Sequence, residues 1–246
     1  MTTAPTYELF YWPGLQGRGE FVRLVLEDSG TPYVDVARLP ADEGGGVSAI
    51  TNLLGGEHPG LLPFAPPILR VGARLIAQMA NICRFLGPRV GLAPPDEDGQ
   101  TAAHQLQLTI ADLVAEVHDT HHPIASSRYY EEQKDAAQAR AAVFRDLRLP
   151  RFLKYFEQVL TRNGGQQLVG ADISYVDLSL FQALEGLAYA FPRSLARTSD
   201  AIPQLLALQG RVRQRPRIAA YLASDRRVPF NETGIFRNYP ELDHPE

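Results

Sequence analysis

The stretch Tyr7-Glu8-Leu9-Phe10-Tyr11-Trp12, followed by Pro13-Gly14-Leu15-Gln16-Gly17, sets the pattern of the first part of the chain. Its bulky, mostly apolar side chains favour a β-strand, and the proline and glycines that follow predict a tight turn. Apolar residues at helical spacing begin near Arg18. The sequence therefore predicts that the phenol of Tyr11 lies beside the amino end of a helix, where the helix dipole favours an anion.

The segment that follows continues this alternation of strands and helices. A strand is predicted at residues 33–36, and two short strands between residues 68 and 77 precede a helix over residues 78–86. Residues 40–62 are rich in glycine and proline, which predicts a long loop with at most a short helix. The order β-α-β, loop, β-β-α indicates an α/β domain over residues 1–88.

The second part of the chain, residues 100–246, has helical patterns throughout. Prolines and glycines in residues 87–99 predict a linker between two domains. Apolar residues that step by three and four predict a helix over about residues 104–120. A second helical pattern, over residues 131–149, meets Pro150, which is expected to kink or restart the helix. Two more helices are expected further along the chain.

Composition excludes several classes of function. The chain has 246 residues, 45% apolar content and 21% charged content, and it has no apolar run long enough for a membrane helix. Its net charge of −4 gives no electrostatic reason to expect nucleic acid. No secretory signal is evident at the first residues, and the single cysteine, Cys83, excludes an internal disulfide. These features favour a cytoplasmic protein in which Cys83 belongs to the core.

Tyr11 is a candidate for holding a thiolate. A free thiol has a pKa of about 8.5, so ionisation near pH 7 needs about 2 kcal/mol of preferential stabilisation of the anion. A charge-assisted hydrogen bond from a phenol contributes roughly 1.5–3 kcal/mol, which is enough for most of this shift. Strand and turn context alone also fits an ordinary packed aromatic side chain, so the neighbouring motifs decide between the two interpretations.

Four motifs, in order, resemble segments of the glutathione transferases, especially tyrosine-type enzymes of a sigma-like or related bacterial or fungal class. The motifs are Tyr11-Trp12 with Gly17-Arg18-Gly19-Glu20, Pro67-Ile68-Leu69, Gln78-Met79-Ala80-Asn81-Ile82, and the segment from Ile202-Pro203 to Leu222. A capping box, Ser174 with Asp177, resembles another family feature. The resemblance covers nearly the whole chain and implies a thioredoxin-like N-terminal domain joined to an all-α C-terminal domain.

The resemblance also implies roles for particular residues. Tyr11 would stabilise the thiolate of glutathione, which is a co-substrate, and no metal or other cofactor is expected. Glutathione would be held by Gln78, Met79, Pro66, Pro67 and Arg18. An acid on the long helix would reach the γ-glutamyl ammonium group across a homodimer, and Asp112, Glu116 and Asp119 all remain candidates. Hydrophobic electrophiles, as in detoxification, would bind in a pocket shaped by Trp12, His121 and Tyr129.

Three departures from the family pattern predict weak binding of glutathione. Met79 replaces a hydroxyl residue that usually contacts the γ-glutamyl carboxylate, and Pro66 has no N–H to donate. No Lys, Arg or Trp lies between Leu39 and Leu69 to bind the glycyl carboxylate. Because each lost neutral hydrogen bond costs about 0.5–1.5 kcal/mol, we expect a roughly tenfold weaker affinity or more.

The cluster His118-Asp119-Thr120-His121-His122 leaves three alternatives open. His118 and His122 are one helical turn apart and could ligate a metal, the histidines could line the electrophile pocket, or they could form a polar helix end. The overall function also has rivals. One is another glutathione-dependent activity, such as peroxide reduction, isomerisation or ether cleavage, and the other is a non-catalytic binding module. The physiological electrophile cannot be inferred from the sequence.

Overall fold

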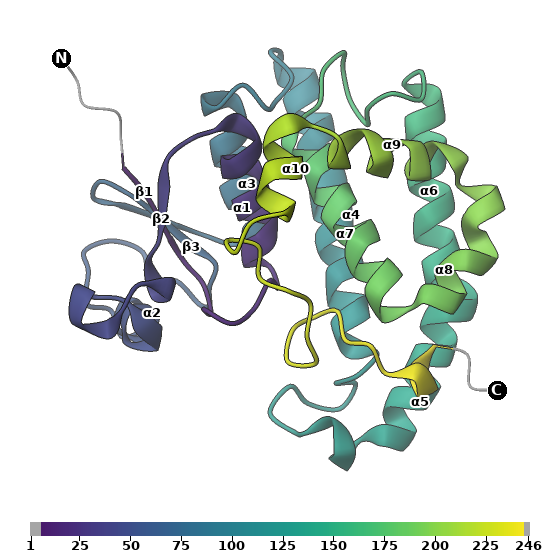
Figure 1. Cartoon of the computed structure of the whole chain (residues 1–246), viewed down its shortest axis with the longest axis horizontal. Coiled ribbons are helices and arrows are strands. Elements are labelled where there is room, and N and C mark those ends of the chain that lie inside the picture. The colour runs from purple at the N-terminus through teal and green to yellow at the C-terminus, as the bar shows by residue number, and fades with distance from the viewer. Residues whose placement is uncertain (1–5, 244–246) are drawn as a thin grey trace.

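The computed structural model describes residues 6–243 as a small mixed sheet with helices packed beside a larger helical part (Figure 1). The regular elements of the first part follow one another as β1 (Tyr7–Phe10), α1 (Gly19–Ser29), β2 (Tyr33–Asp35), α2 (Gly46–Leu54), β3 (Ile68–Val71), β4 (Arg74–Ala77) and α3 (Met79–Leu86). The predicted order of strands and helices in this part is confirmed, with one nine-residue helix, α2, in the segment expected to be mostly loop.

The sheet has the strand order β2-β1-β3-β4. β1 runs parallel to β2 and antiparallel to β3, so Leu9 lies opposite Asp35 on one side and Leu69 on the other. Side chains of a strand alternate between its two faces, and Leu9 therefore packs with α1 and α3, while Phe10 packs with α2. The sheet is a middle layer with helices on both faces.

The second part is helical. Its helices are α4 (Glu97–Asp119), α5 (Lys134–Val143), a π-helical turn (Phe144–Arg148), α6 (Leu149–Arg162), α7 (Tyr175–Ala190), α8 (Pro192–Thr198), α9 (Pro203–Arg213) and α10 (Pro216–Leu222). Single 3-10 turns are Val36–Arg38, Ala41–Glu43, Gly87–Arg89, Tyr130–Glu132, Ser199–Ala201 and Pro240–Leu242. No helix in residues 6–243 is long and apolar enough to cross a membrane. The expected fold class, a thioredoxin-like domain plus an all-α domain, is confirmed.

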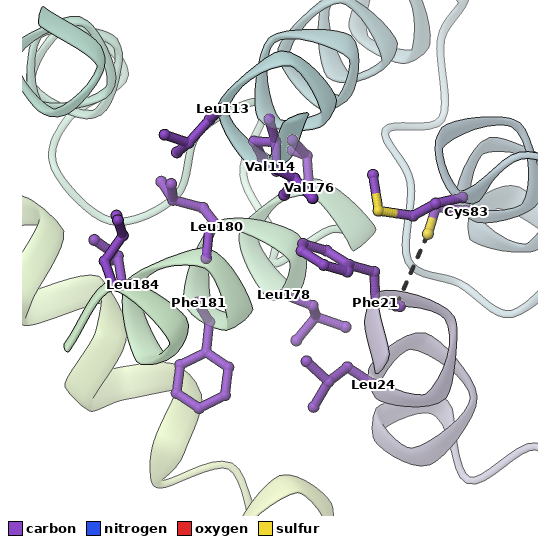
Figure 2. Close-up of a cluster of buried hydrophobic side chains, with 14 of the residues drawn as sticks. Phe21, Leu24, Cys83, Leu113, Val114, Val176, Leu178, Leu180, Phe181 and Leu184 are labelled. Carbon is purple, nitrogen blue, oxygen red and sulfur yellow. Dashed lines mark hydrogen bonds between the residues drawn. The ribbon is translucent and has the colours of Figure 1, made fainter. Parts of the chain in front are cut away.

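Helix α7 is the centre of the molecule, because it packs on α1 from the first part and on α4 and α9 from the second. Figure 2 shows Phe21 and Leu24 of α1 pointing toward Leu178 of α7. Cys83 of α3 lies beside them, fully buried, and burial raises the pKa of its thiol to about 12. Cys83 is thus a core residue, as predicted. Since one apolar core passes through both parts, the boundaries 1–88 and 100–246 stay a prediction.

The start of α7 has the predicted capping box. Asp177 accepts hydrogen bonds from the backbone N–H groups of Ser174, at 2.8 Å, and Leu168, at 2.7 Å. Its carboxylate is buried, and burial raises its pKa to about 6 although these hydrogen bonds act in the opposite direction. The box therefore fixes both the start of α7 and the approach of the preceding loop.

Two expectations about the helices were wrong. The long helix α4 begins at Glu97 and not near residue 104, because Asp96 accepts from the Gly99 N–H as its N-cap. Within the described residues four helices, not two, follow α6, because Pro192, Pro203 and Pro216 each stand in a first turn, where the missing N–H is tolerated. Pro150 stands in the first turn of α6, directly after the π-helical turn, as the expected restart.

Candidate active site

Tyr11 follows the last residue of β1, and its side chain is 5% exposed. Its hydroxyl oxygen accepts a hydrogen bond of 2.9 Å from the backbone N–H of Arg18. A phenol hydroxyl can accept and donate at once, so the proton of this hydroxyl remains available to another acceptor. Burial raises the pKa of Tyr11, although the Arg18 N–H and the charges of Arg18 and Arg23 lower it. The phenol therefore stays protonated at neutral pH, as a donor must.

The turn between β1 and α1 is shaped around this ring. A Cβ atom on Gly17 would lie 2.0 Å from the Tyr11 hydroxyl oxygen, and one on Gly19 would lie 2.5 Å from Cγ of the ring. Gly17 also has a φ of +41°, which other residues rarely adopt. The two glycines let the backbone of the turn contact the tyrosine ring directly. They hold the hydroxyl at the first turn of α1.

A buried group of charged side chains, centred on Arg23, contacts the turn between β1 and α1. Arg23 of α1 is fully buried, and its guanidinium carbon lies 5.8 Å from the centre of the Tyr11 ring. Arg23 donates to the carbonyl of Leu15 at 3.1 Å, to Glu20 at 3.2 Å and to Asp35 at 2.7 Å. Through these bonds one side chain ties the turn to α1 and to β2.

Glu20 extends this group to the end of the chain. Its carboxylate is fully buried and accepts from the hydroxyl of Tyr221, at 2.7 Å, and from the guanidinium of Arg227. Arg227 also donates to Gln182 of α7, which in turn donates to Gln16 of the turn at 2.8 Å. Sequence patterns did not predict this network, because directly bonded members such as Glu20 and Arg227 lie 207 positions apart and no local motif connects them.

The residues expected to hold glutathione lie at β3 and α3. The peptide bond between Pro66 and Pro67 is cis and leads into β3. Gln78, exposed and directly before α3, has a φ of +72°, and it is the one non-glycine residue in residues 6–243 with a positive φ. Holding such a residue in this conformation costs roughly 1–2 kcal/mol, and conformations of this kind concentrate at functional sites. Met79 is 2% exposed and packs in the core, so its side chain is turned inward.

Two acids on α4 differ in their surroundings. Glu116 is paired within the chain with Arg140, at 3.3 Å, and with Arg148, at 2.5 Å, and these arginines lower its pKa. Asp112, one turn earlier, is exposed, and no hydrogen bond or ion pair joins it to another described residue. The structure thus leaves Asp112, together with Asp119, better placed than Glu116 to contact another molecule.

The residues expected in the electrophile pocket have different surroundings. Trp12 packs against the small apolar cluster that joins Phe10 of β1 to Ile50 and Leu53 of α2. Tyr129 is 78% exposed, whereas its neighbour Tyr130 is buried and stacks on Tyr239 with ring centres 4.0 Å apart. The pocket roles of Trp12 and Tyr129 stay predictions.

At the end of α4 the side chains of His118, His121 and His122, here called the histidine triad, form a compact group. Their ring centres lie 4.7–5.3 Å apart. The ring of His121 is buried, and its Nε2 donates to the carbonyl oxygen of Ile235 at 2.7 Å. In the neutral ring the Nδ1 of His121 then carries no hydrogen and accepts a hydrogen bond from Nδ1 of His122. These hydrogen bonds fix which ring nitrogen carries the proton in each of the two histidines. In residues 6–243 no three His, Cys, Asp or Glu side chains, the histidine triad included, are arranged so that they could hold a metal ion.

The last part of the chain, residues 228–242, here called the tail, connects the turn to the histidine triad. In Figure 1 it runs in yellow from α10 past the sheet part toward α5. Asn231 of the tail donates to the carbonyl of Gly14 at 2.9 Å, and Ile235 accepts from His121. Gly186 of α7 makes room for Phe236, since a Cβ there would lie 2.4 Å from its ring. The tail therefore bounds the space beside the Tyr11 turn.

Comparisons with known proteins agree with this architecture. Residues 118–225 match the family model described as "Glutathione S-transferase, C-terminal domain". Glutathione S-transferase P of Bos taurus is 29% identical over 94% of this chain and 99% of its own length, and glutathione S-transferase 1 of Ascaris suum is 26% identical over 92% and 100%. The matches support the glutathione S-transferase family.

Solved structures show the same glutathione S-transferase fold. The Pi-class glutathione S-transferase of Onchocerca volvulus superimposes with a TM-score of 0.66 at 26% identity, covering 88% of this chain and 91% of that one. Prostaglandin synthase D of Nilaparvata lugens gives a TM-score of 0.69 at 21% identity, covering 92% and 100%, and shows the fold alone. Because these relatives include P and Pi-class proteins, the sigma-like subclass stays a prediction.

Proposed function

We propose that the protein is a glutathione transferase that conjugates the thiolate of glutathione to an electrophilic carbon. The relatives named glutathione S-transferase span nearly the full length of the chain and support this activity. The observation that carries the mechanism is the hydroxyl of Tyr11, buried and already accepting from the Arg18 N–H. Its proton is free to be donated to the sulfur of glutathione.

The hydrogen bond from Tyr11 would stabilise the thiolate. About 2 kcal/mol is needed to bring a thiol with a pKa of about 8.5 to ionisation near pH 7, and one charge-assisted hydrogen bond contributes roughly 1.5–3 kcal/mol. The Arg18 N–H contact polarises the hydroxyl in the direction of donation, because chained hydrogen bonds strengthen one another. The amino end of α1 adds a smaller electrostatic contribution.

Glutathione would lie along β3 and the amino end of α3. The free N–H groups of the first turn of α3, which begins at Met79, suit the γ-glutamyl carboxylate. The strained backbone of Gln78 supports a binding role for this corner, and Pro67 would present the adjoining strand edge. The inward side chain of Met79 and the missing N–H of Pro66 support the expected weak affinity.

A homodimer is proposed as the assembly. The loop before β3 exposes three large apolar side chains, Leu61 at 90%, Leu62 at 58% and Phe64 at 92%. An apolar tip of this kind costs free energy in water and is typical of an interface. Phe152 and Tyr155 of α6, with Thr109 of α4 and the stems of Arg148 and Arg151, line a hollow of about 350 Å³ that would accept such a tip from a second copy. Light scattering of Phe64→Ala should then show a shift toward monomer.

We also propose a cytoplasmic location and a role in detoxification. The single cysteine is buried and unpaired, so the fold needs no oxidising compartment. Both proposals rest on the transferase activity, and fractionation of cells with an antibody against the protein would test the location.

Replacing Tyr11 with Phe tests the mechanism. The ring keeps its packing against Gly17 and Gly19, but the donor is lost, so the pKa of bound glutathione should rise and conjugation at pH 7 should fall about tenfold or more. Tyr33→Phe is the matched control, because its hydroxyl binds Glu27 at the edge strand β2. A Tyr11→Phe variant with unchanged thiolate absorbance and unchanged rate would contradict the proposal. A wild-type protein that binds glutathione without conjugating any acceptor would favour the binding module.

A further inference from the structure

Gln182 of α7 contacts the turn between β1 and α1 through a buried side-chain hydrogen bond. Its Nε2 donates to Oε1 of Gln16 at 2.8 Å, and the two residues lie 166 positions apart in the sequence. Gln182 is fully buried and Gln16 is 5% exposed. Because water does not replace a lost partner at this depth, the hydrogen bond matters more for the position of the turn than one at the surface would.

The two amides belong to a chain of hydrogen bonds with a fixed direction. At one end, Nη2 of Arg227 donates to Oε1 of Gln182 at 2.9 Å, and a guanidinium has no acceptor. At the other end, Nε2 of Gln16 donates to the carbonyl of Val228, which can only accept. The donor at the first end and the acceptor at the last therefore fix the orientation of both amide groups.

Gln16 lies directly before the backbone that contacts Tyr11. Its own carbonyl accepts from the Glu20 N–H at 2.9 Å and so begins the first turn of α1. Gly17 comes next and has no side chain, and the N–H of Arg18 then donates to the Tyr11 hydroxyl at 2.9 Å. Gln16 is thus the nearest preceding residue whose side chain can hold this stretch of backbone in place.

Gln182 supports the turn from the centre of the helical part. Arg23 of α1 donates to the carbonyl of Leu15 at 3.1 Å, and Asn231 of the tail donates to that of Gly14 at 2.9 Å in an exposed position. Helix α7, in contrast, packs on α1, α4 and α9. Elements packed in a core move least, so a hydrogen bond from α7 limits the movement of the turn relative to the rest of the molecule.

We infer that Gln182 is a positioning residue for the proposed conjugation: through Gln16 it fixes the turn so that the Arg18 N–H orients the Tyr11 hydroxyl for donation to the sulfur of glutathione. This inference rests on the proposed transferase function and adds a residue of α7 that acts on the thiol only through the turn. Without the bond to Gln16 the turn would shift, the phenol would be oriented less well, and the thiolate would lose part of its stabilisation.

The pH dependence of the reaction separates this role from a purely structural one. A positioning defect raises the pKa of the bound thiol, so the rate falls at neutral pH and recovers once the pH exceeds the new pKa. A general disturbance of the fold lowers the rate at every pH. The ultraviolet absorbance of the thiolate, in the complex with glutathione alone, reports the same pKa without catalysis.

The test replaces Gln182 with Met, which keeps the length of the side chain and removes both of its hydrogen bonds. We expect the pKa of bound glutathione to rise by about 0.5–1 unit and conjugation at pH 7, at saturating glutathione, to fall about two- to fivefold. Above about pH 9 the rates of the variant and the wild type should converge. An unchanged thiol pKa would overturn the inference, and so would a rate loss of the same size at every pH.

Gln107→Met is the matched control. Gln107 is also a fully buried glutamine of a helix, α4, and within residues 6–243 its amide nitrogen and oxygen have no hydrogen-bond partner. Its replacement makes the same chemical change away from the chain of hydrogen bonds, so the thiol pKa should match that of the wild type. An equal rise in the Gln107 and Gln182 variants would show that any buried glutamine has this effect, and the inference would be wrong.

Gln16→Met tests the same bond from the turn and, by the same criteria, decides the question if Gln182→Met does not fold. This variant also loses the bond to Val228, so its thiol pKa should rise at least as much. Because both substitutions break the bond between the two glutamines, the double variant should resemble Gln16→Met alone. Additive rises would mean that the two residues act independently, which would contradict the inference.

The outcomes separate the two proposals. If Tyr11→Phe raises the thiol pKa and Gln182→Met does not, the positioning role is wrong and the transferase function stands. If the wild-type protein neither lowers the pKa of bound glutathione nor conjugates any acceptor, the transferase function itself fails.

Discussion

A Cβ atom on Gly17 would lie 2.0 Å from the hydroxyl oxygen of Tyr11. The catalytic geometry proposed here therefore depends on a residue that has no side chain. The hydroxyl reaches the Arg18 N–H because nothing stands between the ring and the backbone of the turn. A small change at Gly17 should disturb the thiolate without touching any polar group.

Gly17→Ala should act like the loss of the Tyr11 donor. The added methyl group must displace the hydroxyl or the turn, and the φ of +41° is unfavourable for alanine as well. We expect the pKa of bound glutathione to rise and conjugation to fall about tenfold, with a loss of about 1–2 kcal/mol in stability. Thiolate absorbance against pH and urea unfolding measure the two effects.

Gly14→Ala is the control for that substitution. Gly14 lies in the same turn, a methyl group added to it would meet no atom within 4 Å, and its φ is not in the positive range. The activity of this variant should match the wild type. Equal losses in the Gly14 and Gly17 variants would show that the turn's flexibility, and not the contact with Tyr11, is what matters.

Glu20→Ala should strongly destabilise the fold. Glu20 is the shared partner of Arg23 and Arg227 and accepts from Tyr221, all in a buried network. Removing one member of a buried ion pair costs about 3–5 kcal/mol, because the remaining charges lose their compensation. Glu27→Ala removes the pair with Arg226, whose side chain is 61% exposed, and the hydrogen bond from the Tyr33 hydroxyl, and it should cost less, about 1–2 kcal/mol. Urea unfolding of the two variants compares them, and similar costs would contradict the role of the network.

Much of the fold follows from the sequence because its signals are local. The strand, turn and helix signals around Tyr11 and the prolines before β3 are each patterns of residues that are neighbours in the chain. Alternation also explains why Trp12 packs with the same cluster as Phe10, since every second residue of an extended segment points to the same face. The start of α4 differs from the prediction because its N-cap, Asp96, lies within residues 87–99, whose prolines and glycines predict a linker.

The rest of the site depends on contacts between distant parts of the chain. Gln16 binds Gln182 and Glu20 binds Arg227, yet each residue taken alone resembles an ordinary surface polar side chain. Such pairs form because helices α1 and α7 pack together, and no periodicity in the sequence encodes them.

The stability of the protein should fall as the pH falls from about 6.5 toward 4. In the folded protein, burial lowers the pKa of His121 to about 3 and that of His122 to about 4, whereas unfolded histidine titrates near 6.5. Between these values the unfolded state binds more protons, so stability rises with pH in that window and is lost as the pH drops.

A double variant, His121→Asn with His122→Asn, measures this contribution. Asp177 acts in the opposite sense between pH 3.8 and about 6, because its raised pKa keeps a proton on the folded protein, but it is common to both proteins and cancels in the difference. We expect the wild type to lose about 1–3 kcal/mol more than the variant between pH 7.5 and 5.5, as followed by urea unfolding. If the free energies of unfolding of the two proteins changed in parallel with pH, protonation of the histidine triad would not destabilise the fold.

The close contact between Phe236 and Gly186 limits where residues can be inserted into the chain or deleted from it. Asn231 is fixed to Gly14, Ile235 to His121 and Phe236 to α7, so inserting or deleting one residue between Asn231 and Phe236 would displace at least one of these contacts. A Cβ atom on Gly60 would meet no atom within 4 Å, so the part of the loop before β3 that precedes the apolar tip at Leu61 would absorb the same edit. Divergence in this protein should therefore accumulate as length variation before Leu61 and as side-chain exchange in the final segment.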